Sequence, residues 1–186
     1  LSKIDIAKIA HHIERNILKS PGGVQDQYIS SLGGIKKIQV SKNNKIKISD
    51  IKISNKIIKK LERHLVLVYS GLERESDKVV KAQKQNIKQN IEFYDEIKEI
   101  GKKSIICLIN GELDELGILM DQHWKLKIKL ANAISNSKIN YMYNELKNYG
   151  SPGGKIIGAG GGGFFMMVVP KNINSFIDKI NQKGYK

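Results

Sequence analysis

The stretch from Ser151 to Pro170, SPGGKIIGAGGGGFFMMVVP, places the tightest constraint on how this chain folds. Seven of the eleven residues from Gly153 to Gly163 are glycine, and an apolar run follows directly. Each glycine costs the folded state more backbone entropy than another residue would. Such density is expected where bare backbone approaches another group closely, or where N–H groups converge on an anion. The stretch therefore predicts either a tight strand connection packed under another element or a phosphate-binding loop.

Two common phosphate-binding motifs are excluded by what surrounds the glycines. No Lys-Ser or Lys-Thr pair follows Gly163, so the stretch is not a P-loop. A dinucleotide-binding loop leads from a strand into a helix, whereas residues 164–169, FFMMVV, form a predicted strand after the glycines. Glycine content alone leaves the packed connection and the anion-binding loop as equal alternatives.

The composition indicates a globular protein with a strong positive charge. The 186 residues are 40% hydrophobic and 27% charged, enough for one domain or one and a half with an ordinary core. The net charge is +14, yet only three of the 32 basic residues are arginine: Arg15, Arg63 and Arg74. Nucleic-acid surfaces favour arginine interleaved with aromatic residues, and no basic block stands apart here. We therefore expect no nucleic-acid partner, and expect the positive field to attract anionic ligands such as sugar phosphates and ATP.

Cysteine and hydropathy exclude several further classes. Cys107 is the single cysteine, inside the apolar run SIICLI, so the chain has no disulfide framework and no zinc motif. The longest apolar stretch, residues 164–169, is far too short to span a membrane, and no signal peptide is present. These features predict a cytoplasmic protein without a membrane partner.

Apolar spacing predicts the order of the elements. Isoleucines three and four residues apart, from Ile6 to Ile17, predict an amphipathic helix that Pro21-Gly22-Gly23 ends. A helical turn follows at 24–33, and a hairpin lies within 34–54 with SKNNK as its turn. Buried strands are predicted at 64–71 and 164–169, and helices at 74–100, 102–110, 112–122, 123–136, 139–149 and near 172–183. This order favours an α+β fold over an alternating doubly wound sheet, with a boundary near 55–63.

A pair of carboxylates forms the second candidate feature. Glu14 lies on the first predicted helix, and Asp26 follows twelve residues later, beyond the Pro-Gly-Gly turn. Carboxylates on either side of a sharp turn can converge on one cleft. There, one can share Mg²⁺ with nucleotide phosphates, and the other can lie beside an attacking sugar hydroxyl. The alternative is that Glu14 is a solvated helix residue and Asp26 a helix cap.

Together the two features resemble the GHMP kinases, a family named for galactose, homoserine, mevalonate and phosphomevalonate. GGKIIGAGGGGFF is similar to the family's third motif, whose glycines line the active-site floor near the phosphates, although Ile157 stands where many members have Thr or Ser. GGVQDQYISSLGG resembles the catalytic-aspartate segment. The resemblance covers essentially the whole chain and implies a two-domain α+β fold. Residues 1–60 would be the ribosomal protein S5 domain 2-like end of the N-terminal domain, and residues 61–186 a ferredoxin-like, helix-rich C-terminal domain.

Within the family, QDQY, LVYSGLERES and HWKLKIKLANAISNSKINYMY are similar to the branch that acts on a heptose phosphate. The resemblance implies that ATP phosphorylates the anomeric hydroxyl of D-glycero-α-D-manno-heptose 7-phosphate, with Mg²⁺, ATP and sugar phosphate as ligands. Alternatives are a sugar 1-kinase of the fucose or galactose type, and a non-catalytic basic module that binds nucleic acid or protein.

The resemblance implies specific roles for the residues of both features. Asp26 would be the catalytic residue, and Glu14 the Mg²⁺ ligand. The candidates for substrate binding are Gln25, Gln27, Tyr28, Ser70 and Arg74. The candidates for the loop beside phosphate and nucleotide are Gly158, Gly160, Gly161, Gly162 and Gly163. Ser70 and Arg74 lie at and just after a predicted strand end. The alternative for Ser70 is a purely local role, and the alternative for Arg74 is an ion pair with Glu73 or Glu75.

Three further expectations concern the rest of the chain. The family's ATP-binding PxxxGLGSS loop does not occur in the sequence, which predicts a kinase fragment that is inactive alone. A homodimer is left as an open alternative for the oligomeric state. Trp124 is expected in the core, with His123 as a hydrogen-bonded packing residue. Lys155 either reaches phosphate or is solvated.

Overall fold

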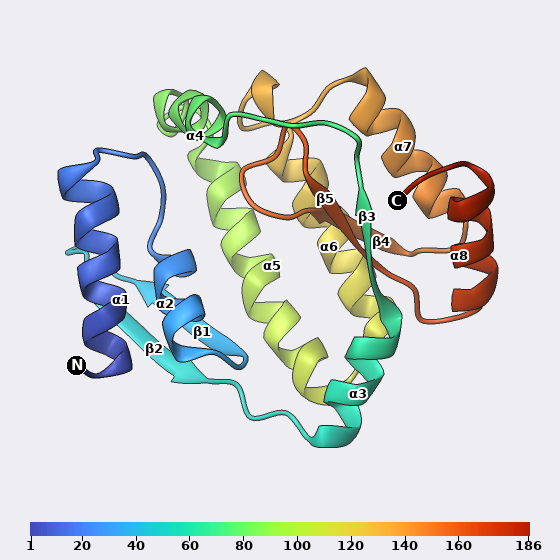
Figure 1. The fold of residues 1–186 in the computed structure, drawn as a ribbon, viewed down its shortest axis with the longest axis horizontal. Helices are drawn as coiled ribbons and strands as arrows, with labels where there is room; N and C mark the ends of the chain where they lie inside the picture. Colours follow the sequence, from blue (N-terminus) through green and yellow to red (C-terminus); the bar gives the residue numbers. More distant parts are fainter. The chain divides into compact units, whose positions relative to one another are not determined.

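The computed structural model describes residues 1–186, which divide into two compact units, Leu1–Lys52 and Ile53–Lys186 (Figure 1). The predicted α+β class is confirmed, because helices and small antiparallel sheets occur in both units. None of the helices combines the length and the apolar character that crossing a membrane requires.

Unit 1 contains, in chain order, α1 (Lys3–His12), the π-helical turn η1 (Ile13–Ile17), α2 (Gln25–Leu32), β1 (Lys36–Val40) and β2 (Ile46–Asp50). Helix α1 begins with a capping box, in which Ser2 Oγ accepts from Asp5 N at 3.2 Å and Asp5 Oδ2 accepts from Ser2 N at 3.1 Å. Strands β1 and β2 pair antiparallel, as the sequence predicts. The π-helical turn is not predicted: Leu18 N donates to Ile13 O, five residues earlier, at 2.9 Å.

Unit 2 contains α3 (Asn55–His64), β3 (Leu65–Tyr69), α4 (Ser76–Gln85), α5 (Ile91–Asn110), α6 (Leu113–Lys127), the 3-10 turn η2 (Asn132–Ile134), α7 (Ser137–Asn148), β4 (Gly153–Ile156), β5 (Phe164–Val168) and α8 (Ile173–Gln182). Its sheet has the order β3-β5-β4, and both pairs are antiparallel. Strands β4 and β5 are consecutive, so the glycine loop is the connection of a hairpin (Figure 1).

Several predicted element boundaries are wrong in unit 2. The helix predicted at 74–100 breaks between α4 and α5, and α5 then continues through Gly101, because one glycine costs a long packed helix only about 1 kcal/mol. The two helices predicted over 112–136 are one helix, α6, followed by η2. The strand predicted as buried at 64–71 corresponds to β3, and it is covered on only one face, since its Leu67 is 56% exposed.

The central strand β5 separates two apolar clusters by the alternation of its side chains. Phe165 and Met167 pack with Trp124 of α6 and with residues of α7 and α8. Val168 packs with α3, α5 and α6, in a cluster that includes the buried Cys107. This period of two is the pattern of a strand covered on both faces. Trp124 is 1% exposed, which confirms its predicted place in the core.

Helix α6 lies against β4 because two glycines leave room for it. A Cβ atom on Gly117 would lie 2.5 Å from Pro152 Cγ, and one on Gly153 would overlap the carbonyl oxygen of Gly117. Neither position accepts a side chain without moving the helix away from the strand. The first glycines of the opening motif therefore serve helix–strand packing, and they fix where the glycine loop begins.

A buried carboxylate joins α6 to α7 and β4. Asp121 is 6% exposed, and its Oδ1 accepts from Tyr143 Oη and Lys147 Nζ, both at 2.8 Å. Lys125 Nζ lies 2.7 Å from its Oδ2, and Tyr143 Oη is also 3.0 Å from Gly154 O on β4. Burial alone would raise the pKa of the Asp121 carboxyl, but the hydrogen bonds from Lys125, Lys147 and Tyr143 outweigh it and lower that pKa.

We predict that Asp121→Asn destabilises unit 2 by about 3 kcal/mol or less at neutral pH, because it leaves the two lysines without their anion. The folded-state pKa of Asp121 is depressed, so its stabilisation is present above the ordinary value of 3.8 and is lost as pH falls through the folded value. Urea unfolding of both proteins, at neutral pH and at low pH, measures this. A difference in unfolding free energy that persists undiminished at low pH would contradict the assignment.

Candidate active site

The turn between η1 and α2 closes around the guanidinium of Arg15. Arg15 Nη1 donates to Ser20 O at 2.9 Å, and its Nη2 and Nε donate to Gly23 O at 3.0 and 3.2 Å. A Cβ atom on Gly22 would overlap this guanidinium. The Pro-Gly-Gly sequence is therefore required for a turn that wraps an arginine, and this turn sets where α2 starts.

Glu14 and Gln27, two of the predicted site residues, meet beside this turn. Gln27 Nε2 donates to Glu14 Oε2, and Arg15 Nη1 lies 3.1 Å from Glu14 Oε1. Glu14 lies on the π-helical turn, a local geometry found often at functional sites. The amide of Gln27 is 8% exposed, and its Oε1 is buried without a hydrogen-bond donor.

Asp26 lies in the first turn of α2, where the partial positive charge of a helix N-terminus favours a carboxylate. Its side chain is exposed and forms no hydrogen bond or ion pair within the chain. Gln25 beside it is also exposed, whereas Tyr28 is buried at 5% exposure. Asp26 and Gln25 thus face solvent, while Gln27 and Tyr28 pack inward.

The oxygen atoms near Glu14 suit Mg²⁺ as a partial ligand set. The Glu14 carboxylate and the unsatisfied Oε1 of Gln27 are hard oxygen donors, the type that Mg²⁺ prefers. No group of three or more His, Cys, Asp or Glu side chains in residues 1–186 is arranged to hold a metal ion. Mg²⁺ commonly takes one or two protein oxygens and completes its shell with phosphate oxygens and water, so this set fits a nucleotide-bound ion.

The glycine loop threads between two other segments at distances that exclude side chains. A Cβ atom on Gly160 would lie 2.7 Å from Ile134 Cγ2, and one on Gly162 would lie 2.6 Å from Leu72 O. Gly160 also has φ +104° and Gly163 has φ +86°, which side-chain-bearing residues rarely adopt. The bare backbone therefore serves close packing, one of the two alternatives that glycine content leaves open.

Packing uses only part of the loop's hydrogen-bonding capacity. Gly161 N donates to Ile134 O at 2.7 Å, and Gly163 N donates to Leu72 O at 2.9 Å. The N–H groups of Gly158, Ala159 and Gly162 have no acceptor in the chain, whereas the turn at residues 158 and 159 directs the Gly160 N–H toward Ile157 O. Free N–H groups in a glycine-rich turn are the feature that binds anions. The loop therefore also offers donors that an anion can use, and the anion-binding alternative stays a prediction.

Side chains from three elements hold the loop carbonyls. Arg74 donates through Nη1 to Gly162 O and through Nη2 to Ile157 O, the latter at 3.1 Å. Gln83 Nε2 donates to Ala159 O at 3.1 Å, and Lys127 Nζ donates to Gly158 O.

The loop fixes the surroundings of Arg74 and Ser70. Arg74 forms no ion pair with Glu73 or Glu75, and Glu75 instead pairs with Lys78 at 2.9 Å, so that alternative is wrong. The Nε of Arg74 is buried without an acceptor. Ser70 is 4% exposed and its Oγ accepts from Leu72 N at 3.3 Å. The substrate roles of both residues stay predictions.

Two lysines and a histidine near the loop carry lowered pKa values. Burial, together with the charges of Lys155 and Arg74, lowers the pKa of Lys127 to about 8. Burial also lowers the pKa of Lys155. Burial, followed by Lys155 and Lys127, lowers the pKa of His123 to about 3, so its imidazole is neutral at physiological pH. Lys155 Nζ lies 3.4 Å from His123 Nδ1, which confirms the predicted hydrogen-bonded role of His123.

Sequence reasoning missed Lys127 as a functional candidate. Its signal is the four-residue spacing from His123 on α6, which places both side chains on one helix face. In a chain with 32 basic residues, one more lysine at helical spacing carries little information.

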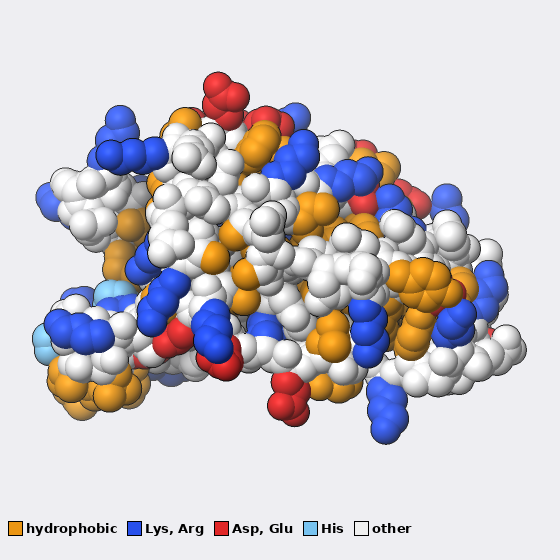
Figure 2. Space-filling view, turned by 90° about the horizontal axis from the view of Figure 1, so that it is seen from above, with side chains coloured by type: hydrophobic (Ala, Val, Ile, Leu, Met, Phe, Trp, Pro, Cys, Tyr) orange, Lys and Arg blue, Asp and Glu red, His pale blue; other side chains and the backbone are white.

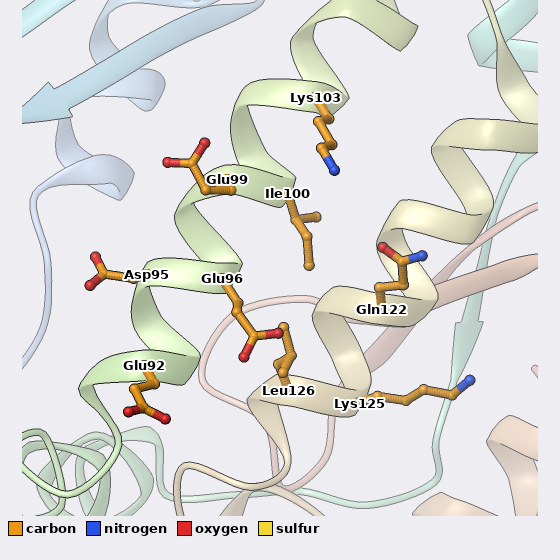
Figure 3. A pocket seen from close by; sticks show the side chains of 9 residues that line it. All are labelled: Glu92, Asp95, Glu96, Glu99, Ile100, Lys103, Gln122, Lys125 and Leu126. Carbon is orange, nitrogen blue, oxygen red and sulfur yellow. The ribbon is translucent and has the colours of Figure 1, made fainter.

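A groove of unit 2 on the surface of α5 and α6 has a different chemistry. It measures about 660 Å³ and lies between α5 and α6. Figure 3 shows Glu96 and Ile100 directed toward Leu126 across the groove, whereas Glu92, Asp95 and Glu99 lie along α5 on the side away from α6. The acidic residues of α5 make this groove unsuited to phosphate.

The comparisons with known proteins agree with the sequence motifs. Residues 104–186 match the family described as GHMP kinases C terminal, which agrees with the family resemblance of the sequence motifs. Over 189 residues, the chain is 29% identical to D-glycero-alpha-D-manno-heptose 7-phosphate kinase of Campylobacter jejuni, covering 100% of the chain and 56% of that protein. It is 29% identical to the bifunctional fucokinase/GDP-fucose pyrophosphorylase of Arabidopsis thaliana, covering 90% of the chain and 16% of that protein. The chain thus spans about half the length of the first relative and a much smaller share of the second.

Solved structures show the same fold. A D-glycero-D-manno-heptose 1-phosphate kinase from Bacteriodes thetaiotaomicron matches with a TM-score of 0.65 and 22% identity, covering 98% of this chain and 50% of that one. The L. major mevalonate kinase matches with a TM-score of 0.75 and 20% identity, covering 98% and 55%. At these identities the likeness shows the fold alone, and it agrees with the predicted GHMP kinase fold.

We predict that Gly160→Ala destabilises the chain by about 2 to 3 kcal/mol, because the new Cβ meets Ile134 and the backbone has φ +104°. The matched control is Gly101→Ala in α5, where a Cβ meets nothing within 4 Å. There we expect a gain of about 0.5 to 1 kcal/mol from helix propensity. Denaturant unfolding measures both, and equal effects at the two positions would contradict the packing described for the loop.

We predict that Lys127 loses its proton in the folded protein near pH 8, below its ordinary value of 10.5. Between these values the unfolded chain binds the proton and the folded chain does not, so folding stability should rise with pH relative to Lys127→Gln. NMR titration of the Lys127 ammonium and urea unfolding of both proteins across this range measure it. A stability difference that is flat with pH would rule out the depressed pKa.

Proposed function

We propose that this chain is part of an ATP-dependent sugar kinase that phosphorylates the anomeric hydroxyl of D-glycero-α-D-manno-heptose 7-phosphate. The observation that carries the proposal is the glycine loop, whose free N–H groups lie within the residues that match GHMP kinases C terminal. Phosphoryl transfer needs donors placed around phosphate oxygens more than it needs covalent chemistry. The sugar is proposed from the named activity of the Campylobacter jejuni relative. Because the chain spans only part of its relatives, the activity is proposed for the intact protein that contains it.

Asp26 is the proposed catalytic residue. It is exposed and unpaired at the start of α2, so its carboxylate is free to hydrogen-bond an incoming hydroxyl. We propose that it orients the C1 hydroxyl of the sugar and accepts its proton as the bond to phosphorus forms. Gln25, Tyr28 and Ser70 are proposed to bind the sugar.

Glu14 and Gln27 are the proposed ligands of the magnesium ion that accompanies ATP. When bound, Mg²⁺ neutralises charge on the phosphate oxygens. Within the chain, Arg15 fixes the turn that carries Glu14, and the hydrogen bond from Gln27 Nε2 holds the carboxylate toward α2. These contacts pre-orient the Glu14 carboxylate before nucleotide binds.

The glycines from Gly158 to Gly163 are proposed to contact phosphate through backbone N–H groups. Arg74 crosses the loop and holds two of its carbonyls, so we propose that it keeps the N–H groups turned toward the ligand. This gives Arg74 a positioning role in addition to its predicted contact with substrate.

A fucose- or galactose-type 1-kinase is the second candidate, favoured by the relative from Arabidopsis thaliana whose name includes fucokinase. A panel of sugars and sugar phosphates, with ATP consumption as the readout, separates the two.

A non-catalytic basic module is the third candidate function. Figure 2 shows lysine and arginine side chains dispersed among polar, apolar and acidic ones on the face in view, which does not favour a nucleic-acid surface. Strongly salt-dependent RNA binding without sugar phosphate binding would support that third candidate.

We predict that Asp26→Asn lowers kcat of the intact protein by about 10²-fold or more while leaving its melting temperature unchanged, because it removes a proton acceptor from an exposed position. The matched control is Asp77→Asn, since Asp77 is also exposed and occupies the same position in the first turn of α4. We expect that variant to keep the parent kcat. Turnover of Asp26→Asn near the parent rate would refute the catalytic role of Asp26.

A further inference from the structure

Three cationic side chains lie beside the first residues of the glycine loop, and none of them has a carboxylate partner. Arg74 follows β3, Lys127 ends α6, and Lys155 lies on β4, three residues before Gly158. Lys127 Nζ and Arg74 Nη2 each donate to a carbonyl of the loop. None of the ion pairs in the chain includes any of the three cations. Their positive charges are therefore not offset by any side chain.

This arrangement costs folding free energy. Lys127 and Lys155 are partly withdrawn from water, and each positive charge repels the others. His123 is neutral and adds only a polar contact to Lys155. Buried charges elsewhere in the unit are paired, as Asp121 is with two lysines. Uncompensated like charges of this kind are expected where a bound ligand supplies the missing charge.

Hydrogen-bond donors without acceptors occur at the same place. The N–H groups of Gly158 and Ala159 have no acceptor in the chain, and Arg74 Nε is buried and unpaired. A ligand that takes up both the charges and these donors must be an anion with several oxygens. A tetrahedral phosphate dianion meets both requirements.

We propose that Arg74, Lys127 and Lys155, together with the N–H groups of Gly158 and Ala159, form a binding subsite for a phosphate group. The subsite rests on the proposed kinase function and adds Lys127 and Lys155 to its site. In the working enzyme the phosphate belongs either to the phosphorylated sugar or to the nucleotide, two sources with the same recognition chemistry.

The first experiment titrates inorganic phosphate into the intact protein by calorimetry or NMR. Lys127→Gln combined with Lys155→Gln is expected to weaken binding by about 10-fold or more, since it removes two charge-assisted contacts to the phosphate. The matched control is Lys84→Gln with Lys88→Gln, which removes two exposed lysines that make no hydrogen bond or ion pair. Unchanged phosphate affinity in the first pair, or an equal loss in both pairs, would overturn the subsite.

Two further measurements separate ligand binding from support of the loop. Without phosphate, the double variant is expected to melt at the parent temperature or above, because it removes repulsion between unpaired charges. Lys127→Arg keeps the charge and is expected to keep phosphate binding. Loss of binding in Lys127→Arg as complete as in Lys127→Gln would point to distortion of the loop and would overturn the proposal.

Kinetics identify the source of the phosphate. A raised KM for the sugar phosphate alone assigns the subsite to the sugar, and a raised KM for ATP alone assigns it to the nucleotide; either supports the proposal. Unchanged values for both would overturn it. If the parent protein transfers no phosphate to any sugar, the proposed kinase function fails, while the titration with inorganic phosphate still decides whether the subsite exists.

Discussion

Backbone-to-backbone approach without intervening side chains is the constraint on which unit 2 depends. Gly117 and Gly153 let α6 lie against β4, and Gly160 and Gly162 let the following loop lie against Ile134 and Leu72. The two sets of contacts are consecutive along the chain, so the position of the helix fixes the position of the loop. A side chain at any of these points would shift the N–H groups that the loop leaves free. The glycine loop can therefore be tightly packed and still offer donors to an anion, because packing uses the N–H groups of Gly161 and Gly163 and leaves other N–H groups unpaired.

The same helix carries two charged sites that are treated in opposite ways. Asp121 is buried with Tyr143, Lys125 and Lys147, and these donors satisfy both of its oxygens. One turn and a half further along α6, Lys127 is withdrawn from water beside other cations and donates only to a carbonyl. The first arrangement stabilises the fold by itself. The second is stable only because the rest of the unit holds it, which is the usual relation between a scaffold and the site it carries.

Local patterns explain how much of the fold the sequence predicts. Helix α1, the hairpin of β1 and β2, and the core position of Trp124 follow from apolar spacing and turn residues, which act over a few positions. The errors occur where tertiary packing overrides a local signal. Gly101 suggests a break, but α5 runs through it, because residues on both sides of the glycine pack on the same neighbours. The prediction places no strand before the glycine loop, because glycine is uncommon in strands and β4 contains two. The small size of Gly153 is needed by α6, and that of Gly154 by β5, and neither partner is a neighbour in sequence.

The candidate site follows the same division. Motifs identify Glu14, Asp26 and the loop glycines, because spacing and glycine density are visible in a single sequence. Lys127 and the unpaired Oε1 of Gln27 are visible only after folding, since burial and missing partners are properties of three-dimensional packing. For Gln27 the consequence is specific. A buried amide oxygen without a donor costs about 1 to 3 kcal/mol. Gln27 turns its Nε2 toward Glu14, so its Oε1 is left free on the other side of the amide, and a cation bound there would remove this cost without breaking the contact with Glu14.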